Sequence, residues 1–205
     1  MTVVTPWHNH LELARDYWLA MRAADAPVIV VDNGSEPPLP NALRLDTNEG
    51  FSRACNVGLH AATSDAVLFL NNDVGATSPD WLQRIREALE PGVLVGAKLR
   101  SDPHADVDGE RLPYLDGWCL AGMRDDLLDL GGFDEEYAEP AYYSDNDLCL
   151  RARAAGMTLR EVRVGLHHKV NGTASPQDER TVRATAANRE RYEIRARQLL
   201  TTVAA

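Results

Sequence analysis

The sequence predicts an α/β protein, in which helices flank a mostly parallel sheet, built as a single domain with a C-terminal helix. Strand-like and helix-like segments alternate over residues 2–99 in the order β-α-β-β-α-β-α-β, which is typical of a parallel sheet covered by helices. The strand-like runs at 27–35 and 65–70 are apolar until they reach a polar turn. A chain of 205 residues with 44% hydrophobic residues is also large enough for one domain with a real core.

The first half of the chain supplies most of the expected sheet. We expect strands at 2–6, 27–35, 41–47, 65–70 and 92–99. Helices are expected at 10–24, 51–63 and 78–90. The first helix should place Leu11, Ala14, Trp18 and Met21 on one side. The third opens with Ser78 as N-cap and Pro79 in its first turn, which indicates a helix start.

The second half begins with a polar loop at 100–113 and continues with further strands and helices. We expect strands at 114–123 and 158–168, and helices at 124–137, 142–157 and 177–200. Gly131-Gly132 and Gly156 would end the first two of these helices. The chain would then divide into a folded domain over 1–175 and an Arg-rich helical tail over 176–205.

The tail has only a modest apolar stripe, and three interpretations of it stay open. It could pack on the domain, pair with a second copy as a homodimer, or lie on an anionic membrane as a peripheral contact. The stripe consists of Val182, Thr185, Ala186, Arg189, Ile194 and Leu199.

Composition excludes several classes of function. A net charge of −10 argues against nucleic acid as a partner, because binding phosphate backbones needs a basic surface. The three cysteines are odd in number and form no C-x-x-C pair, so a reduced, cytoplasmic protein is the simplest expectation. We expect no signal peptide and no transmembrane segment, since no apolar run approaches the roughly 20 residues of a membrane span.

Polar residues follow four of the expected strands. Thr5-Pro6-Trp7 ends the first strand, and Asp32-Asn33-Gly34-Ser35 the second. Asn71-Asn72-Asp73 follows the strand at 65–70, and His167-His168 ends the last strand. Because ligands of parallel α/β sheets bind at the carboxyl ends of the strands, these residues indicate one binding edge.

Several common enzyme motifs are missing from the sequence. No G-x-G-x-x-G follows the first strand, and no phosphate-binding G-x-x-x-x-G-K-[ST] loop is present. The sequence also has no G-x-S-x-G elbow, so a serine hydrolase is poorly supported. Two carboxylates and a histidine remain as candidate catalytic or ligand-binding groups.

Five segments in order resemble the GT-A glycosyltransferases of family 2, and most closely their rhamnosyltransferase-like branch. They are VVTPWHN, VIVVDNGS, NEGFSRACNVGLHAATSDAVLFLNNDV, GWCLAGMRDDLLDLGGFDEEY and YSDNDLCLRARAAGM. The resemblance covers roughly residues 2–173. It implies a GT-A, Rossmann-like fold and transfer of a sugar from a nucleotide-diphosphate-sugar, carried on UDP, dTDP or GDP, to an acceptor hydroxyl.

The resemblance also implies a metal site. The family's D-x-D motif reads Asn71-Asn72-Asp73 here, so Asp73 would bind Mn²⁺ or Mg²⁺ at the donor diphosphate. The family supplies a histidine after the last strand, in an H-x-x-G-x-S-like setting. His168 fits best, five residues before Thr173, and His167 is the neighbour that could replace it.

The same resemblance assigns roles on the donor and acceptor sides. Asp145 aligns with the catalytic base of an inverting reaction, where Ser144 replaces the usual Glu, and Asp147 would be structural or would orient the acceptor. Trp118 would be an apolar wall for a sugar or a core residue. The donor nucleotide would meet Thr5, Pro6, Trp7, Asp32, Asn33, Asn48, Gly50, Phe51, Asn56, Asn71 and Asn72.

Two other functions compete with glycosyl transfer. A nucleotidyltransferase shares the sheet and the metal-diphosphate chemistry, but it would usually show a Gly-rich, Arg- or Lys-containing loop where TPWHNH stands. A non-catalytic sugar- or nucleotide-binding module is the other, and the joint presence of Asp73, Asp145 and His168 speaks against it. The acceptor could be a glycan, a lipid-linked sugar or a protein.

Overall fold

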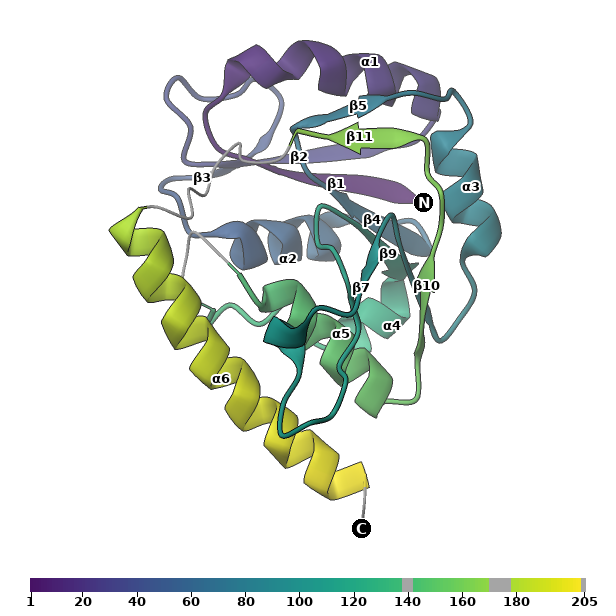
Figure 1. Cartoon of the computed structure of the whole chain (residues 1–205). Helices are drawn as coiled ribbons and strands as arrows, with labels where there is room; N and C mark the ends of the chain where they lie inside the picture. Colours follow the sequence, from purple (N-terminus) through teal and green to yellow (C-terminus); the bar gives the residue numbers. More distant parts are fainter. Residues whose placement is uncertain (138–141, 170–177, 204–205) are drawn as a thin grey trace.

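The computed structural model describes residues 1–137, 142–169 and 178–203, and its centre is a seven-stranded sheet (Figure 1). The strand order is β10-β6-β9-β4-β1-β2-β3. The strands are β1 (Thr2–Trp7), β2 (Val28–Asn33), β3 (Leu43–Leu45), β4 (Ala66–Leu70), β6 (Val93–Gly96), β9 (Cys119–Met123) and β10 (Thr158–Glu161). Every pairing is parallel except the two made by β9, so the expected α/β class with a mostly parallel sheet is confirmed.

The antiparallel strand β9 lies in the middle of the sheet. It hydrogen-bonds β4 on one side, with Leu68 opposite Ala121, and β6 on the other, with Val95 opposite Ala121. Only part of the strand expected at 114–123 belongs to this sheet. Its first two residues form β8 (Tyr114–Leu115), which pairs with β7 (Leu99–Arg100).

Helices cover both faces of the sheet, as predicted. α1 (Ala14–Ala24) and α3 (Trp81–Ala88) lie on one face, and α2 (Phe51–Ala61), α4 (Arg124–Asp129) and α5 (Ser144–Ala154) on the other (Figure 1). Alternate residues of the central strands therefore enter two different cores. Leu68 and Leu70 pack with α1 and α3, whereas Val67 and Phe69 pack with α2, α4 and α5.

Only part of the stripe expected on the first helix faces the core: Met21 is buried and Ala14 packs against the core. A short 3-10 turn, η1 (Leu11–Leu13), precedes α1, and Leu11 and Trp18 are 48% and 45% exposed. The residues that α1 buries are Tyr17, Ala20, Met21 and Ala24. The reason lies upstream: Asn9 and His10 have φ of 54° and 55°, which no right-handed helix accepts, so the helix begins later than expected.

The helix α3 is shorter than the sequence predicted, whereas α4 ends at the expected glycine pair. α3 begins at Trp81 rather than 78, with Asp80 instead of Ser78 at its N-cap position. α4 ends at Asp129, and Gly131 and Gly132, both with positive φ, turn the chain away before residue 137.

The last strand does not belong to the main sheet, contrary to the expectation of one edge with four strand ends. β11 (Leu166–His168) pairs antiparallel with β5 (Val74–Ala76) in a separate two-stranded ribbon. This ribbon lies beside α1 and begins directly after Asp73 (Figure 1). The histidine pair consequently reaches the carboxyl end of β4 through the ribbon and not through the sheet.

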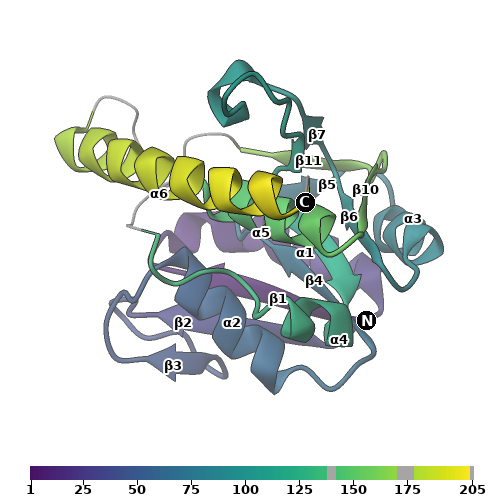
Figure 2. The same ribbon diagram turned by 90° about the horizontal axis from the view of Figure 1, so that it is seen from below.

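The C-terminal helix α6 (Glu179–Val203) packs along α5, which supports the first of the three interpretations of the tail (Figure 2). The expected apolar stripe is wrong, because Val182 and Ile194 are exposed. The buried residues of α6 are Thr181, Ala184, Asn188, Tyr192 and Ala196.

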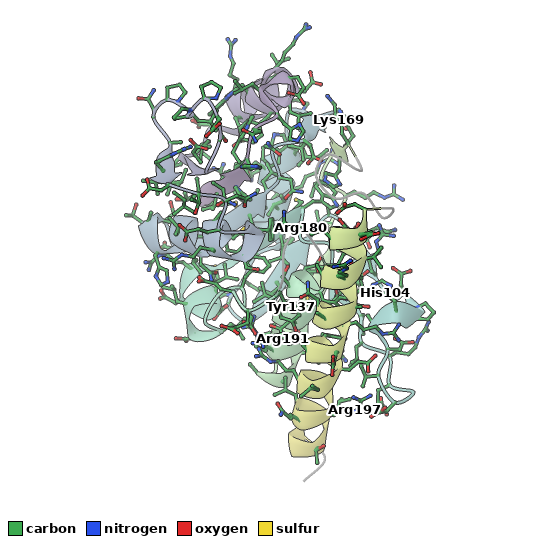
Figure 3. All side chains as sticks on the ribbon, turned by 90° about the vertical axis from the view of Figure 1, so that its left-hand side faces the viewer. His104, Tyr137, Lys169, Arg180, Arg191 and Arg197 are labelled. Atoms are coloured by element: carbon green, nitrogen blue, oxygen red, sulfur yellow. The ribbon has the colours of Figure 1, made fainter. Side chains whose placement is uncertain are left out.

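Side chains of α6 hold it against the domain. The Arg191 guanidinium lies 5.6 Å from the ring centroid of Tyr137, and both side chains are on the domain side of the helix (Figure 3). Tyr192 donates a hydrogen bond of 3.1 Å to the carbonyl oxygen of Ala105. The predicted domain boundary at 175/176 lies outside the described residues. Among the described residues, no helix combines the length and the apolarity that crossing a bilayer requires.

Candidate active site

Asp73 and His168 face each other just beyond the carboxyl end of β4. His168 Nε2 lies 3.0 Å from Asp73 Oδ1, and the two side chains are largely buried. That carboxylate oxygen has no hydrogen bond of ordinary geometry with any described residue. Two potential ligand atoms thus converge without bonding each other well, which is the arrangement expected where both share a cation.

The β5–β11 ribbon explains why His168 rather than His167 reaches Asp73. Side chains alternate along a strand, so the two histidines point to opposite faces of the ribbon. His167 stands opposite Gly75, and a Cβ atom on that glycine would collide with the imidazole. Next to His168, Lys169 donates its backbone N–H to the carbonyl oxygen of Asp73 at 2.9 Å, which continues the pairing of the ribbon and fixes the spacing of its strands at this end. Of the two histidines that the sequence left open, His168 is the one whose ring lies against Asp73.

The donor set at this position suits a divalent cation. A carboxylate oxygen is a ligand for Mg²⁺ and Mn²⁺, and imidazole is acceptable to Mn²⁺. The side-chain nitrogen of Asn71 lies 3.4 Å from His168 Nε2. Within the described part of the chain, no group of three or more His, Cys, Asp and Glu side chains gathers to hold a metal. Asp73 and His168 are thus two candidate ligands, fewer than a complete coordination shell.

Trp118 lies directly against His168. The two rings are parallel to within 4°, with centroids 4.9 Å apart. The carbonyl oxygen of Trp118 accepts the backbone N–H of Asn71 at 2.9 Å. The sequence left Trp118 as either a sugar wall or a core residue, and the structure shows that one face of its ring is covered by the imidazole.

Asp145 lies at the start of α5, held by the turn that contains Gly117. Its Oδ2 accepts the Gly117 N–H at 2.9 Å, and its Oδ1 accepts the Asn146 N–H at 3.0 Å. Burial raises the pKa of Asp145, and the nearby charge of Asp116 raises it further, although the two backbone N–H groups act in the opposite direction. A Cβ on Gly117 would come 3.1 Å from the Asp145 Cβ, so only glycine allows this approach comfortably.

Asp147 is fully buried and has a different environment from Asp145. It accepts hydrogen bonds from Arg151 Nε at 2.7 Å and Tyr137 Oη at 3.1 Å, and Arg195 of α6 lies 3.2 Å away. A carboxylate without exposed surface has no face for an acceptor in this structure. Of the two roles that the sequence allowed, the structural one is supported by these contacts.

At the end of β2, Asp32 organises the following loop instead of facing solvent. Its carboxylate accepts the N–H groups of Ser35 and Leu39, each at 2.9 Å, and pairs with Arg44 at 2.5 Å. Burial would raise the pKa of Asp32, but these hydrogen bonds outweigh it and hold the pKa below the ordinary value. Sequence reasoning missed Arg44. Its place on β3 beside β2 was a possible signal, since parallel neighbours bring Arg44 opposite Asp32.

Asn33 connects the end of β2 with the start of α2. Its amide nitrogen donates to Asn48 Oδ1 at 2.9 Å and to the Gly50 carbonyl at 3.1 Å, while its oxygen accepts the Glu49 N–H. Gly34 makes this possible, because a Cβ there would lie 2.5 Å from the Asn48 backbone nitrogen. His8, which the sequence did not single out, joins the same region: its Nδ1 lies 2.8 Å from the Asn33 carbonyl oxygen.

The remaining residues predicted at the nucleotide have side chains engaged in packing. Thr5 Oγ1 lies 2.7 Å from Tyr17 Oη, and Trp7 is buried against the same tyrosine. Asn56 bonds both the N–H and the carbonyl oxygen of Phe133, at 2.9 and 2.8 Å. Pro6 and Asn72 are half-buried, and Phe51 packs edge-on against Phe133. The structure thus brings together Asp73, His168, Asn71 and Trp118, and Asp145 contacts Gly117, the residue before Trp118. The side chains of Thr5, Trp7 and Asn56 are buried.

Solved glycosyltransferase structures share this architecture. The chain superposes on the mannosyltransferase PcManGT from Pyrobaculum calidifontis, solved with GDP-Man and Mn²⁺, with a TM-score of 0.64 and 18% identity; the match covers 99% of this chain and 74% of that one. A Drosophila β1,4-galactosyltransferase 7 mutant, solved with manganese, UDP-Gal and xylobiose, gives a TM-score of 0.57 at 16% identity, covering 88% and 78% of the two chains. These likenesses confirm the expected GT-A fold.

Sequence comparisons also find glycosyltransferases. The chain is 30% identical over 195 residues to the pre-mycofactocin glycosyltransferase of Mycobacterium tuberculosis, a match that covers 78% of this chain and 40% of the relative. It therefore spans less than half the length of that protein. Residues 2–118 match the profile of the family described as glycosyl transferase family 2. Since that match includes more than half of the chain, this protein belongs to glycosyl transferase family 2.

Proposed function

We propose that this protein transfers a sugar from a nucleotide-diphosphate-sugar to an acceptor hydroxyl, with inversion at the anomeric carbon. The observation that carries the proposal is the convergence of Asp73 Oδ1 and His168 Nε2, 3.0 Å apart, at the carboxyl end of β4. Ligands of parallel α/β sheets bind at this edge. Family membership and the fold support the same reaction class.

Asp73 and His168 would hold a divalent cation, Mn²⁺ or Mg²⁺. When bound, such a cation offsets the negative charge that develops on a departing diphosphate. Both side chains are largely buried, and the Lys169–Asp73 backbone bond fixes the spacing of the segments that carry them, which supports this role. The mannosyltransferase from Pyrobaculum calidifontis, which shares the fold, was solved with GDP-Man and Mn²⁺, and that supports this choice of ligands.

Asp145 would act as the general base. Its carboxylate would take the proton from the acceptor hydroxyl while that oxygen forms a bond to the anomeric carbon. The bond from this carbon to the diphosphate oxygen breaks in the same step, and the diphosphate leaves with the electron pair. A raised pKa favours this role, because a base works best when its pKa approaches the working pH. The hydrogen bond from Gly117 orients the carboxylate.

Donor and acceptor are proposed only as classes. Hexose or rhamnose-like sugars on UDP, dTDP or GDP fit the reaction, and the acceptor would be a glycan, a lipid-linked sugar or a protein. The Drosophila enzyme that shares the fold was solved with UDP-Gal and xylobiose, which supports a sugar hydroxyl as the acceptor.

The test combines a donor panel with three variants. UDP-, dTDP- and GDP-sugars are screened with Mn²⁺ for transfer or hydrolysis, and the product anomer is read by NMR. Asp73→Ala should lose both metal dependence and nucleotide affinity. Asp145→Asn should bind donor nearly normally but transfer at least about 100-fold more slowly, as loss of a general base typically costs about 10²–10⁴ in rate. His167→Ala, on the other face of the ribbon, is the matched control.

Three results would refute the proposal. They are full activity of Asp73→Ala in EDTA, a retained anomeric configuration, and a near-native rate for Asp145→Asn. Binding of nucleotide without turnover of any donor would instead favour the non-catalytic module.

A further inference from the structure

The turn formed by Asp116, Gly117 and Trp118, hereafter the 116–118 turn, contacts both halves of the proposed site. Gly117 donates its N–H to Asp145, and the Trp118 ring lies parallel to the His168 imidazole at 4.9 Å. Asp116 pairs with Arg100 at 3.0 Å. Three consecutive residues therefore touch the base, the metal ligand and a charged neighbour.

The backbone of this turn is fixed on both sides. Asp116 donates its N–H to the Lys98 carbonyl at 3.0 Å, and the Trp118 carbonyl accepts the N–H of Asn71 at 2.9 Å. The second bond joins the turn to the residue that directly follows β4. Part of the indole also packs against the core on the α1 side of the sheet. Trp118 is accordingly held in place independently of His168.

His168 itself has few other restraints. Metal-binding histidines usually donate their second ring N–H to a carboxylate, a carbonyl or water, which fixes the orientation of the ring. Among the residues that the structure describes, no protein group bonds His168 Nδ1, while Nε2 faces Asp73 and Asn71. The flat contact with Trp118 is the ring-to-ring contact that the described residues make with this imidazole.

We infer that Trp118 is a positioning residue: its indole holds the His168 imidazole in the plane that directs Nε2 toward Asp73, and so pre-forms the cation site. The inference rests on the proposed function, since it takes Asp73 and His168 as the cation ligands. It gives Trp118 a role different from a wall for the sugar ring, because the ring face in question is occupied by His168. Loss of such an outer partner typically weakens metal binding about 10–100-fold.

The experiment measures Mn²⁺ binding alone, by electron paramagnetic resonance titration of the purified protein, so that no donor needs to be known. Trp118→Leu should bind Mn²⁺ about 10–100-fold more weakly. Trp118→Phe keeps an aromatic face and should stay close to the unchanged protein. Trp18→Leu removes an exposed tryptophan on α1 and is the matched control. Urea unfolding of each variant separates a loss of positioning from a loss of stability.

Asp73→Ala separates this inference from the proposed function. If Asp73→Ala loses Mn²⁺ and Trp118→Leu binds it like the unchanged protein, the positioning role is refuted and the cation site stands. If Asp73→Ala binds Mn²⁺ normally, the cation site fails and the inference fails with it.

A second measurement covers the case in which Trp118→Leu does not fold. In the unchanged, metal-free protein, the stacked indole should shift the His168 Hε1 resonance upfield of the other histidines, assigned with a His168→Gln variant. A resonance in the ordinary range would overturn the inference.

Discussion

Replacing Asp147 by alanine should destabilise the protein severely. The carboxylate is fully buried and lies among three side chains: Arg151, one turn along α5; Tyr137, from the loop after α4; and Arg195, from α6. Alanine would leave two guanidinium groups facing a small void. Arg195 would keep Asp134 at 2.9 Å, and Arg151 would keep two backbone carbonyls, so the loss is partial for each cation.

The expected magnitude follows from the burial of this group. Removing one partner of a buried ion pair typically costs about 3–5 kcal/mol, because the remaining charge loses its compensation. For a chain of this size, about 2–4 °C of melting temperature is lost for each kcal/mol, which gives a decrease of about 6–20 °C. An exposed pair gains far less from solvent-screened attraction. Glu179, paired with Arg183 at 3.0 Å on the outer face of α6, is the matched control because both side chains are more than four-fifths exposed.

Urea unfolding, monitored by circular dichroism, tests this prediction. Asp147→Ala should strongly lower the urea concentration at the midpoint of unfolding without changing the dependence of the unfolding free energy on urea concentration. Glu179→Ala should leave the midpoint unchanged. A loss below about 1 kcal/mol for Asp147→Ala would refute the reasoning, since it would place this pair in the range of surface ion pairs. It would mean that α6 does not remain docked over α5 in solution.

Two further predictions concern the 116–118 turn. The base must be ionised, so activity should fall as the pH drops through the raised pKa of Asp145. Asp116→Asn removes one cause of the raised pKa, so the acid limb of the kcat profile should move to lower pH. Asp125→Asn, at an exposed carboxylate, should leave that limb unchanged. An unmoved limb in Asp116→Asn would contradict the assignment. Gly117→Ala places a methyl group 3.1 Å from the Asp145 Cβ, so kcat should fall while the affinity for Mn²⁺ stays constant. An equal loss of kcat and of Mn²⁺ affinity would contradict this prediction, because it would show that the whole turn had moved.

The sequence predicted the parts of the fold that depend on local pattern. The apolar run of β4 and the polar triplet after it needed only neighbouring residues, and Asp73 lies where that pattern placed it. The orientation of β9 depends on partners far along the chain, and an apolar strand buried on both faces has no pattern that reveals its direction. The ribbon of β5 and β11 has three residues in each strand, too few for a period of two to be recognised.

Two acidic residues on one helix show a further limit of sequence reasoning. Asp145 and Asp147 are two positions apart on α5, so their side chains point about 200° away from each other. One meets the Gly117 turn, and the other enters the interface with α6. The resemblance to the family named both residues, but which of them faces the site depends on how α5 is rotated against β8 and α6. That rotation is set by packing with segments more than 25 residues away in sequence, which local pattern does not contain.

The central place of β9 also governs which pieces of this chain can fold. Among the described strands, residues 119–123 of β9 are the ones that hydrogen-bond both β4 and β6, so the two halves of the sheet pair through a segment that is synthesised late. A fragment ending at residue 118, where the family match stops, would leave the inner edges of β4 and β6 unpaired. Both strands are apolar and almost entirely buried in the intact sheet, so the fragment would expose two unpaired, aggregation-prone strand edges. Expression of such a fragment should end in inclusion bodies, and truncation experiments on this protein need an end point beyond Met123.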